Sequence, residues 1–125
     1  MRRGKQMMPF WASILLLPLL FFSGCHDAHD APPVYPGTLI ITNSAFSGDD
    51  IWYAYATPSS SSAWGEDLLG GETLYPGDSL VLDVYECDRY YDVRVDYAYG
   101  TVAEEYGVWV PCDATTEVIF NDGGY

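Results

Sequence analysis

From residue 38 onward, the chain consists of short apolar segments separated by turn residues. One of them alternates Leu80, Leu82 and Val84 with polar positions such as Asp83, which is the two-residue period of a strand with one buried face. Segments rich in β-branched and aromatic residues, the usual composition of strands, lie at 38–43, 51–57, 79–85 and 115–121. The pattern predicts an all-β fold.

The residues between these segments suggest how they connect. Ser-Gly-Asp-Asp at 47–50 is a turn sequence, so the strands at 38–43 and 51–57 are expected to pair antiparallel. The segment Trp-Gly-Glu-Asp-Leu-Leu at 64–69 is expected to form one helical turn that caps one end of the core with Trp64 and its two leucines. Apart from the apolar run near the N-terminus, no segment keeps a helical period for three turns.

Residues 87–112 have the pattern of a hairpin that turns at Tyr99 and Gly100. If opposed residue numbers sum to 199, Cys87 faces Cys112 and a disulfide closes the loop. The same register opposes Tyr91 to Val108, Val93 to Tyr106, Tyr97 to Val102, Arg94 to Glu105 and Tyr90 to Trp109. Its one mismatch, Val95 against Glu104, would be relieved by a β-bulge or by a local slip of the register. The disulfide should stabilise an exported domain by roughly 3 kcal/mol.

The N-terminus has the layout of an export signal. Arg2, Arg3 and Lys5 precede an apolar run at 10–22, which at about 1.5 Å per residue covers roughly 20 Å and is too short to span a hydrocarbon core of about 30 Å. The run ends in Phe-Ser-Gly-Cys, which resembles the lipobox of bacterial lipoproteins, with Phe where Leu is usual. The resemblance implies cleavage before Cys25 and lipidation of that residue. The alternative is an ordinary cleaved signal that leaves Cys25 as a spare thiol.

The expected mature chain is strongly acidic. Without residues 1–24 it keeps only Arg89 and Arg94 against 18 carboxylates, which is a net charge of −16. Nucleic acid and anionic headgroups require a basic footprint, so the composition argues against them as partners. The charge favours cations or basic proteins as partners, or serves solubility alone.

The sequence divides into three parts. Residues 1–24 are the expected lipoprotein signal peptide, and residues 25–37 are a lipidated tether, because residues 26–37 carry three prolines and have no apolar period. His26 and His29 lie in this tether without a scaffold that would make them a metal site. Residues 38–125 are the expected folded domain.

The domain resembles a group of small exported bacterial β-sandwich domains, most of which are uncharacterised. The resemblance rests on Trp-Gly-x-Asp-Leu-Leu at 64–69, Pro-Gly-Asp-Ser at 76–79 and Tyr-Asp-Val-Arg-Val at 91–95 between the paired cysteines, and it covers most of residues 38–120. It implies a β-sandwich and carries no catalytic residues across. The fold class expected is therefore an all-β, small antiparallel β-sandwich of immunoglobulin-domain size with one short helical turn, after an N-terminal signal peptide.

Catalysis is not expected. A nucleophilic Ser or Cys needs a nearby base such as His, and residues 38–125 contain no histidine and only the two cysteines that are expected to pair. The carboxylates could supply a glycosidase-type pair. The small size of the domain argues against that mechanism.

Two kinds of binding site are candidates. Hard cations take carboxylate ligands, and the hairpin register brings Glu86, Asp88 and Asp113 to one end as a possible calcium site, although no EF-hand spacing occurs. Aromatic side chains could instead contact a sugar or a protein, and Tyr90 and Trp109 are the favoured pair because they share the more polar hairpin face with Arg94.

The sequence thus predicts a non-catalytic envelope lipoprotein that acts as a protein-interaction or structural module. The alternative is a calcium-dependent or carbohydrate-binding domain. No cofactor is expected beyond possible calcium. The membrane is contacted through the lipid, nucleic acid is not a partner, and the protein partner is unknown. In Gram-negative lipoproteins an Asp after the modified Cys favours the inner membrane; His26 stands there in this chain, so the resemblance to lipoproteins implies the outer membrane if the envelope is Gram-negative.

Overall fold

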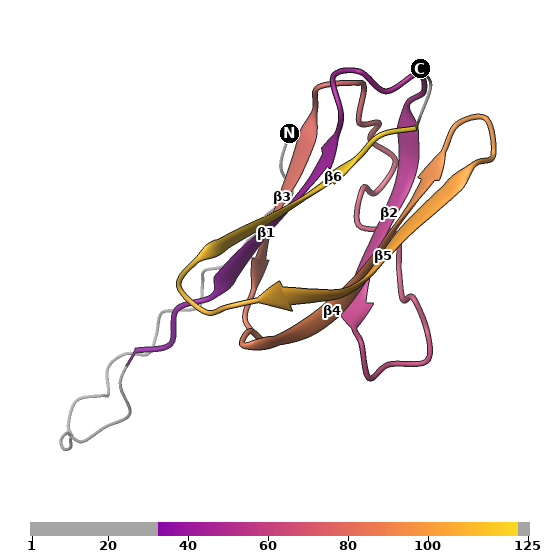
Figure 1. Cartoon of the computed structure of the whole chain (residues 1–125). Coiled ribbons are helices and arrows are strands. Elements are labelled where there is room, and N and C mark those ends of the chain that lie inside the picture. The colour runs from indigo at the N-terminus through magenta and orange to yellow at the C-terminus, as the bar shows by residue number, and fades with distance from the viewer. Residues whose placement is uncertain (1–32, 123–125) are drawn as a thin grey trace, which may run out of the picture.

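Six β-strands form the part of the chain that the computed structural model describes, residues 33–122. They are β1 (Gly37–Asn43), β2 (Ile51–Pro58), β3 (Ser79–Val84), β4 (Arg89–Tyr97), β5 (Val102–Val110) and β6 (Thr115–Phe120). One sheet has the order β3-β1-β6 and the other the order β2-β4-β5, and the two face each other across the core (Figure 1). The predicted all-β sandwich is therefore confirmed. The signal peptide, Cys25 and most of the tether lie outside the described residues.

The expected pairing of the first two strands is wrong, because β1 and β2 belong to different sheets. β1 pairs antiparallel with β3, which places Leu39 opposite Leu82, and it pairs parallel with β6, which places Ile41 opposite Val118. The loop between β1 and β2 crosses the end of the sandwich. Its crossing is fixed by the fully buried Asn43, whose side-chain amide donates to the carbonyls of Asp49 and Leu74, each at 2.9 Å. These hydrogen bonds satisfy the buried amide and hold the loop against Leu74, in the segment before β3, so that the chain leaves β1 for the other sheet.

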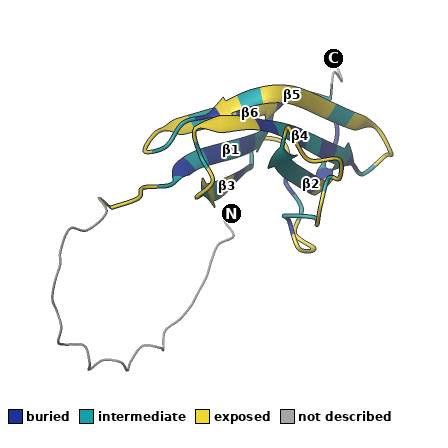
Figure 2. Ribbon diagram, turned by 90° about the horizontal axis from the view of Figure 1, so that it is seen from below, coloured by how far each residue is buried: buried dark blue, intermediate teal, exposed yellow. Residues whose placement is uncertain are grey.

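Alternate residues of the strands supply the core. β1 and β4 follow the two-residue period closely, and β1 is the most deeply buried strand in Figure 2, whereas β5 and β6 are largely exposed. The expected alternation of Leu80, Leu82 and Val84 is also found, since Leu80 is fully buried and the other two pack against the core. The buried apolar residues are Leu39, Ile41, Ile51, Ala54, Leu69, Leu74, Leu80, Tyr91, Val93, Val95, Tyr97, Val110, Val118 and Phe120.

The hairpin of β4 and β5 follows the predicted register at one end and departs from it at the other. Arg89 faces Val110, Tyr90 faces Trp109 and Tyr91 faces Val108, as expected. Between Tyr91 and Val93 the register shifts by one residue, so the expected pairs of Val93 with Tyr106, Arg94 with Glu105 and Tyr97 with Val102 are wrong. The observed pairs are Val93 with Glu105, Arg94 with Glu104, Val95 with Ala103 and Asp96 with Val102. The bulge removes the mismatch of Val95 with Glu104, because Val95 now faces Ala103.

The predicted disulfide between Cys87 and Cys112 is present, with the two Cα atoms 5.0 Å apart. It joins the chain just before β4 to the chain just after β5, so it closes the open end of the hairpin. The carboxylate of Asp88 accepts a hydrogen bond from the backbone amide of Cys112 at 3.0 Å, and the amide of Asp113 donates to the carbonyl of Pro36, also at 3.0 Å. The last residues of the tether are therefore fixed to this end of the domain.

The helical turn expected at 64–69 does not form, and residues 33–122 contain no helix. The segment is an irregular loop that crosses the outside of the β2-β4-β5 sheet at Trp64 and enters the core only at Leu69, which is fully buried. The expectation that Trp64 caps the core is wrong for the same reason. In the described part of the chain, no helix has the length and apolar character needed to cross a membrane.

Candidate functional site

The outer face of the β2-β4-β5 sheet gathers most of the side chains that could recognise a ligand. Tyr91, Val93, Val95 and Tyr97 of β4 point into the core, so the alternate residues of that strand point outward. Their neighbours on β2 and β5, together with Trp64 from the loop, complete a surface that we call the aromatic face. Its rings are Tyr53, Tyr55, Trp64, Tyr90, Tyr106 and Trp109, and its charged residues are Asp92, Arg94, Asp96 and Glu104.

Arg94 occupies the middle of this face. Its guanidinium donates to Asp96 at 2.8 Å and lies 3.6 Å from a carboxylate oxygen of Glu104. The hydrogen bond to Asp96 is the main cause that raises the pKa of Arg94. The same guanidinium lies 5.9 Å from the ring centre of Tyr55 and 6.0 Å from that of Trp64, which are cation–π distances. Arg94 is thus fully engaged within the protein.

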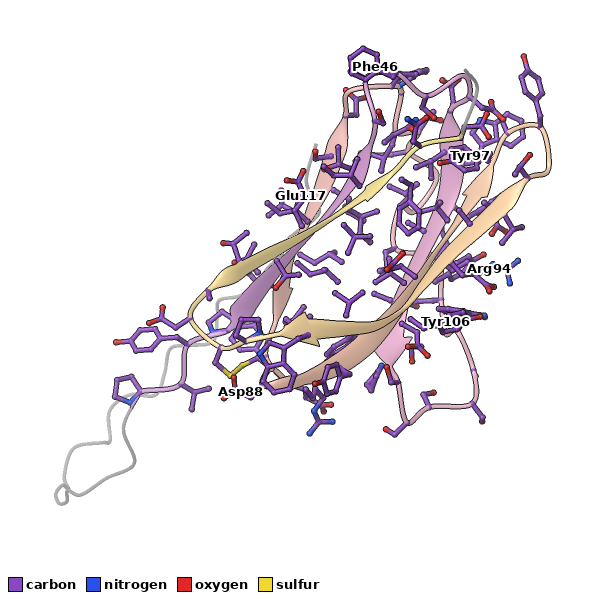
Figure 3. The ribbon with its side chains drawn as sticks, in the orientation of Figure 1. Phe46, Asp88, Arg94, Tyr97, Tyr106 and Glu117 are labelled. Carbon is purple, nitrogen blue, oxygen red and sulfur yellow. A yellow bond between two sulfur atoms is a disulfide. The ribbon has the colours of Figure 1, made fainter. Side chains whose placement is uncertain are left out.

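A hollow of about 190 Å³ lies between the loop before Trp64 and the outer face of the sheet. Its lining residues are Thr57, Ser61, Ser62, Ala63, Trp64, Asp92 and Tyr106, and we call it the Trp64–Tyr106 hollow. The ring centres of Trp64 and Tyr106 are 6.3 Å apart with their planes inclined by 42°. Figure 3 shows Tyr106 next to Arg94, on the side of the sandwich away from Glu117.

Asp92 is the carboxylate of this hollow, and it is held by one oxygen. Its Oδ1 accepts hydrogen bonds from the Ser59 hydroxyl at 2.6 Å and from the Gly107 amide at 3.1 Å. Gly107 can present its amide in this way because it lies at the bulge of β5 with a φ of 69°, in the left-handed region that favours glycine. The bulge therefore orients the Asp92 side chain in addition to shifting the β4–β5 register by one residue.

Trp64 is held in place by the loop that follows it. One oxygen of the Asp67 carboxylate accepts hydrogen bonds from the amides of Ala54 at 3.0 Å and Leu69 at 3.1 Å, and the other accepts one from Gly70 at 3.1 Å. Three amides on one carboxylate tie the loop to β2, and burial of Leu69 fixes its far end. This explains the conformation of the Trp-Gly-x-Asp-Leu-Leu element, in which Asp67 is the anchor that sequence reasoning missed.

Tyr106 is positioned by its neighbour on the same strand. Its hydroxyl donates to the carboxylate of Glu104, and this hydrogen bond is the main cause that raises the pKa of Tyr106. Glu104 in turn pairs with Arg94. The second wall of the hollow is therefore connected to the same charged group that contacts Trp64.

The structure brings two of the three predicted binding residues together. Tyr90 and Trp109 face each other across β4 and β5 with their ring centres 4.9 Å apart in an edge-to-face contact, and they are 55% and 45% exposed. Arg94 lies on the same face, but it contacts Tyr55 and Trp64 instead of this pair. Arg94 is four positions along β4 from Tyr90, which is a rise of about 13 Å at roughly 3.3 Å per residue.

The structure does not bring the three carboxylates proposed for calcium together as a group of metal ligands. Glu86 makes an ion pair with Arg89 at 3.3 Å, and Asp88 accepts the Cys112 amide, so each has its own partner within the chain. Asp113 follows Cys112 with its backbone amide on Pro36. Across residues 33–122, no three His, Cys, Asp or Glu side chains are grouped as ligands for a metal ion.

A second hollow of about 340 Å³ lies where β5 approaches β6, and its lining is Glu105, Val108, Glu117, Val118 and Ile119. Glu105 faces the fully buried Val93, so a carboxylate occupies the core side of an edge strand. Inward charges and bulges on edge strands discourage the addition of another strand. The free edge of β5 is therefore protected, and recognition by strand addition there is disfavoured.

Comparison with known proteins gives no assignment: no protein-family model matches the sequence, and no match is found among curated proteins or solved structures.

Proposed function

We propose that this protein is a non-catalytic recognition module of a bacterial cell envelope and that the aromatic face is the surface that contacts its partner. The observation that supports this is the exposure of several large rings on one face, with Tyr90 55%, Tyr106 62% and Trp109 45% exposed. Tyr and Trp are enriched where protein partners meet, because they bury a large apolar area and keep a polar group for hydrogen bonding. These rings lie outside the core, so the packing of the core does not account for them.

The charge of the domain supports a protein partner over a nucleic acid. Residues 33–122 carry two arginines against 16 carboxylates, a net charge of −14, and both arginines already make ion pairs. A surface of this kind repels phosphate backbones and attracts basic proteins. The proposed partner is therefore a protein with a basic contact surface.

The proposed anchor is a lipid on Cys25, in the outer membrane if the envelope is Gram-negative. The domain begins at Gly37 on the disulfide end, where Pro36 is hydrogen-bonded to Asp113. Residues 25–36 could extend by about 40 Å at 3.3 Å per residue, enough to hold the domain clear of a lipid headgroup layer. Labelling with a palmitate analogue in the producing cells should mark the wild-type chain and leave the Cys25→Ser variant unmarked. A wild-type chain that takes up no label would contradict the anchor.

The recognition role is tested by quantitative mass spectrometry of proteins that co-purify, after mild cross-linking, with three forms of the chain. The double variant Tyr90→Ser with Trp109→Ser removes the exposed ring pair. The matched control, Val81→Ser with Ile119→Ser, removes two exposed apolar side chains from the outer face of the other sheet. We expect the first variant to lose co-purifying proteins that the wild type and the control retain. The same set of co-purifying proteins with all three forms would contradict the proposal.

Carbohydrate binding is the second candidate, and the exposed Tyr90–Trp109 pair favours it because a sugar ring can stack on such rings. A glycan array is the direct test. A glycan bound by the wild type and lost by Trp109→Ser would favour this function over protein recognition.

A further inference from the structure

The Trp64–Tyr106 hollow contains a carboxylate that has no cation within the described part of the chain. Residues 33–122 include two basic side chains. Arg94 is paired with Asp96 and Glu104, and Arg89 is paired with Glu86. The partners of Asp92 are a hydroxyl and an amide, both on its Oδ1. The negative charge of Asp92 is thus solvated by dipoles and not neutralised by an ion pair.

The walls of the hollow are suited to a cation. Trp is the ring with the strongest attraction for a cation placed over its face, and Tyr shares the property. The protein already contains an example, since the guanidinium of Arg94 lies 6.0 Å from the ring centre of Trp64. Trp64 and Tyr106 line the hollow together with Asp92, so two aromatic rings and a carboxylate border the same space.

The size of the hollow limits what can occupy it. Its volume of about 190 Å³ is below the roughly 300–1,000 Å³ of pockets that enclose a drug-sized ligand. It equals about six water molecules at roughly 30 Å³ each, which is room for one long side chain. The hydroxyls of Thr57, Ser61 and Ser62 around it can accept hydrogen bonds from an ammonium or guanidinium group.

We propose that the Trp64–Tyr106 hollow binds a lysine or arginine side chain exposed on the partner protein, with Asp92 as its counter-ion. This inference rests on the proposed recognition function and names the chemistry of the contact. The alkyl stem of such a side chain packs against the rings of Trp64 and Tyr106 while its charged end meets Asp92. The net charge of −14 on residues 33–122 attracts a basic partner from a distance and makes the contact sensitive to salt.

The test is a nuclear magnetic resonance titration of the ¹⁵N-labelled full-length chain in uncharged detergent. The probes are two short peptides with glycine on both sides of the central residue, which is lysine in one and uncharged norleucine in the other. Two reporters lie at the site: the indole N–H of Trp64 and the backbone amide of Gly107, which donates to Asp92. We expect the lysine peptide to move both resonances saturably and the norleucine peptide to leave them in place. Equal shifts with the two peptides would overturn the proposal.

Two variants separate a specific contact from the general charge of the protein. Asp92→Asn keeps an oxygen that can accept from Ser59 and Gly107, so its fold should be retained, but it removes the counter-ion. Asp83→Asn removes the same charge from the exposed outer face of the other sheet. We expect Asp92→Asn to weaken lysine-peptide binding about fivefold to tenfold and Asp83→Asn to leave it within about twofold. If both variants weakened lysine-peptide binding equally, net charge alone would explain the effect, and the proposed site would be wrong.

The outcomes also distinguish this inference from the proposed function. If the lysine peptide moves resonances near Tyr90 and Trp109 but not those of Trp64 and Gly107, the aromatic face recognises basic partners and the hollow does not. If a neutral disaccharide moves the two reporters and the lysine peptide does not, the hollow takes a sugar and the proposal is wrong. If neither probe moves the Trp64 and Gly107 resonances while the loss of Tyr90 and Trp109 still removes co-purifying proteins, the proposed recognition function stands. The proposed contact in the Trp64–Tyr106 hollow is then wrong.

Discussion

The carboxylate of Asp92 on β4 accepts a hydrogen bond from the backbone amide of Gly107 on β5 at 3.1 Å, where the two strands are out of their expected register. One extra residue in β5 thus does two things. It moves Glu104 opposite Arg94, and it aims a carboxylate into the hollow between Trp64 and Tyr106. Bulges often re-aim side chains in this way near functional sites.

Replacing Gly107 should test the bulge. Gly107→Ala puts a Cβ on a residue with a φ of 69°; no atom lies within 4 Å of that Cβ, so the cost is backbone strain and not a clash. We expect a loss of about 1 kcal/mol in the free energy of unfolding. Urea denaturation monitored by tryptophan fluorescence measures it. The control Val102→Ala, at an exposed position of the same strand, should cost less, and a Gly107→Ala protein as stable as wild type would argue against the strained bulge.

Removing the disulfide should lower stability without changing the fold. In Cys87→Ser with Cys112→Ser, the unfolded chain regains the freedom of a loop with a sequence separation of 25, and we expect a loss of about 3 kcal/mol. The hydrogen bond of Asp88 to the backbone at position 112 does not depend on sulfur and should persist. Thermal unfolding of the wild type should have a lower midpoint with reductant than without it. A midpoint unaffected by reductant would contradict the stabilising role.

Asp67 should contribute more to stability than its position in an irregular loop suggests. Asp67→Ala leaves the amides of Ala54, Leu69 and Gly70 without their acceptor, and we expect a loss of about 2 kcal/mol. Glu66→Ala, the matched control next to it, removes a charge from an exposed residue and should change stability by less than about 0.5 kcal/mol. Chemical denaturation compares the two. Equal effects would contradict the anchoring role of Asp67.

Several features of the fold could be predicted from the sequence because they depend on local pattern. The strands expected at 38–43, 51–57, 79–85 and 115–121 begin and end within one residue of those bounds, and the cysteine pair followed from opposing apolar residues across one hairpin. The partners of β1 could not be predicted, because alternation shows which residues of a strand are buried but not which strands lie beside it. They are set by pairing between residues far apart in the chain, such as Leu39 with Leu82 and Ile41 with Val118.

The candidate site was only partly accessible from the sequence for a similar reason. Tyr90 and Trp109 were found because they oppose each other in one hairpin. The hollow was not found, because it is formed by a loop laid over the sheet, and the pattern at 64–69 suggested a helical turn. The three amides bound by Asp67 hold that loop in an irregular conformation on β2, and Trp64 contacts Tyr106 and Arg94 on the outer face of the sheet instead of the core.

Alkaline pH should destabilise the domain through its buried tyrosines. Burial raises the pKa of Tyr91 and of Tyr97 above the ordinary value of 10.0. Between the unfolded and folded pKa values, the folded state keeps protons that the unfolded state has lost, so stability is complete below about pH 10 and falls as pH rises through this window. Urea denaturation at a series of alkaline pH values should show the decline. Tyr97→Phe should make it shallower, and a stability independent of pH above 10 would contradict the prediction.

The aromatic face is tested most directly by photo-cross-linking in the producing cells. A benzophenone amino acid replaces Tyr90 on this face or, as the control, the equally exposed Ile119 on the outer face of the other sheet. We predict that light produces a defined protein adduct from position 90 and none from position 119. An adduct from position 119 with none from position 90 would contradict the assignment of the recognition surface.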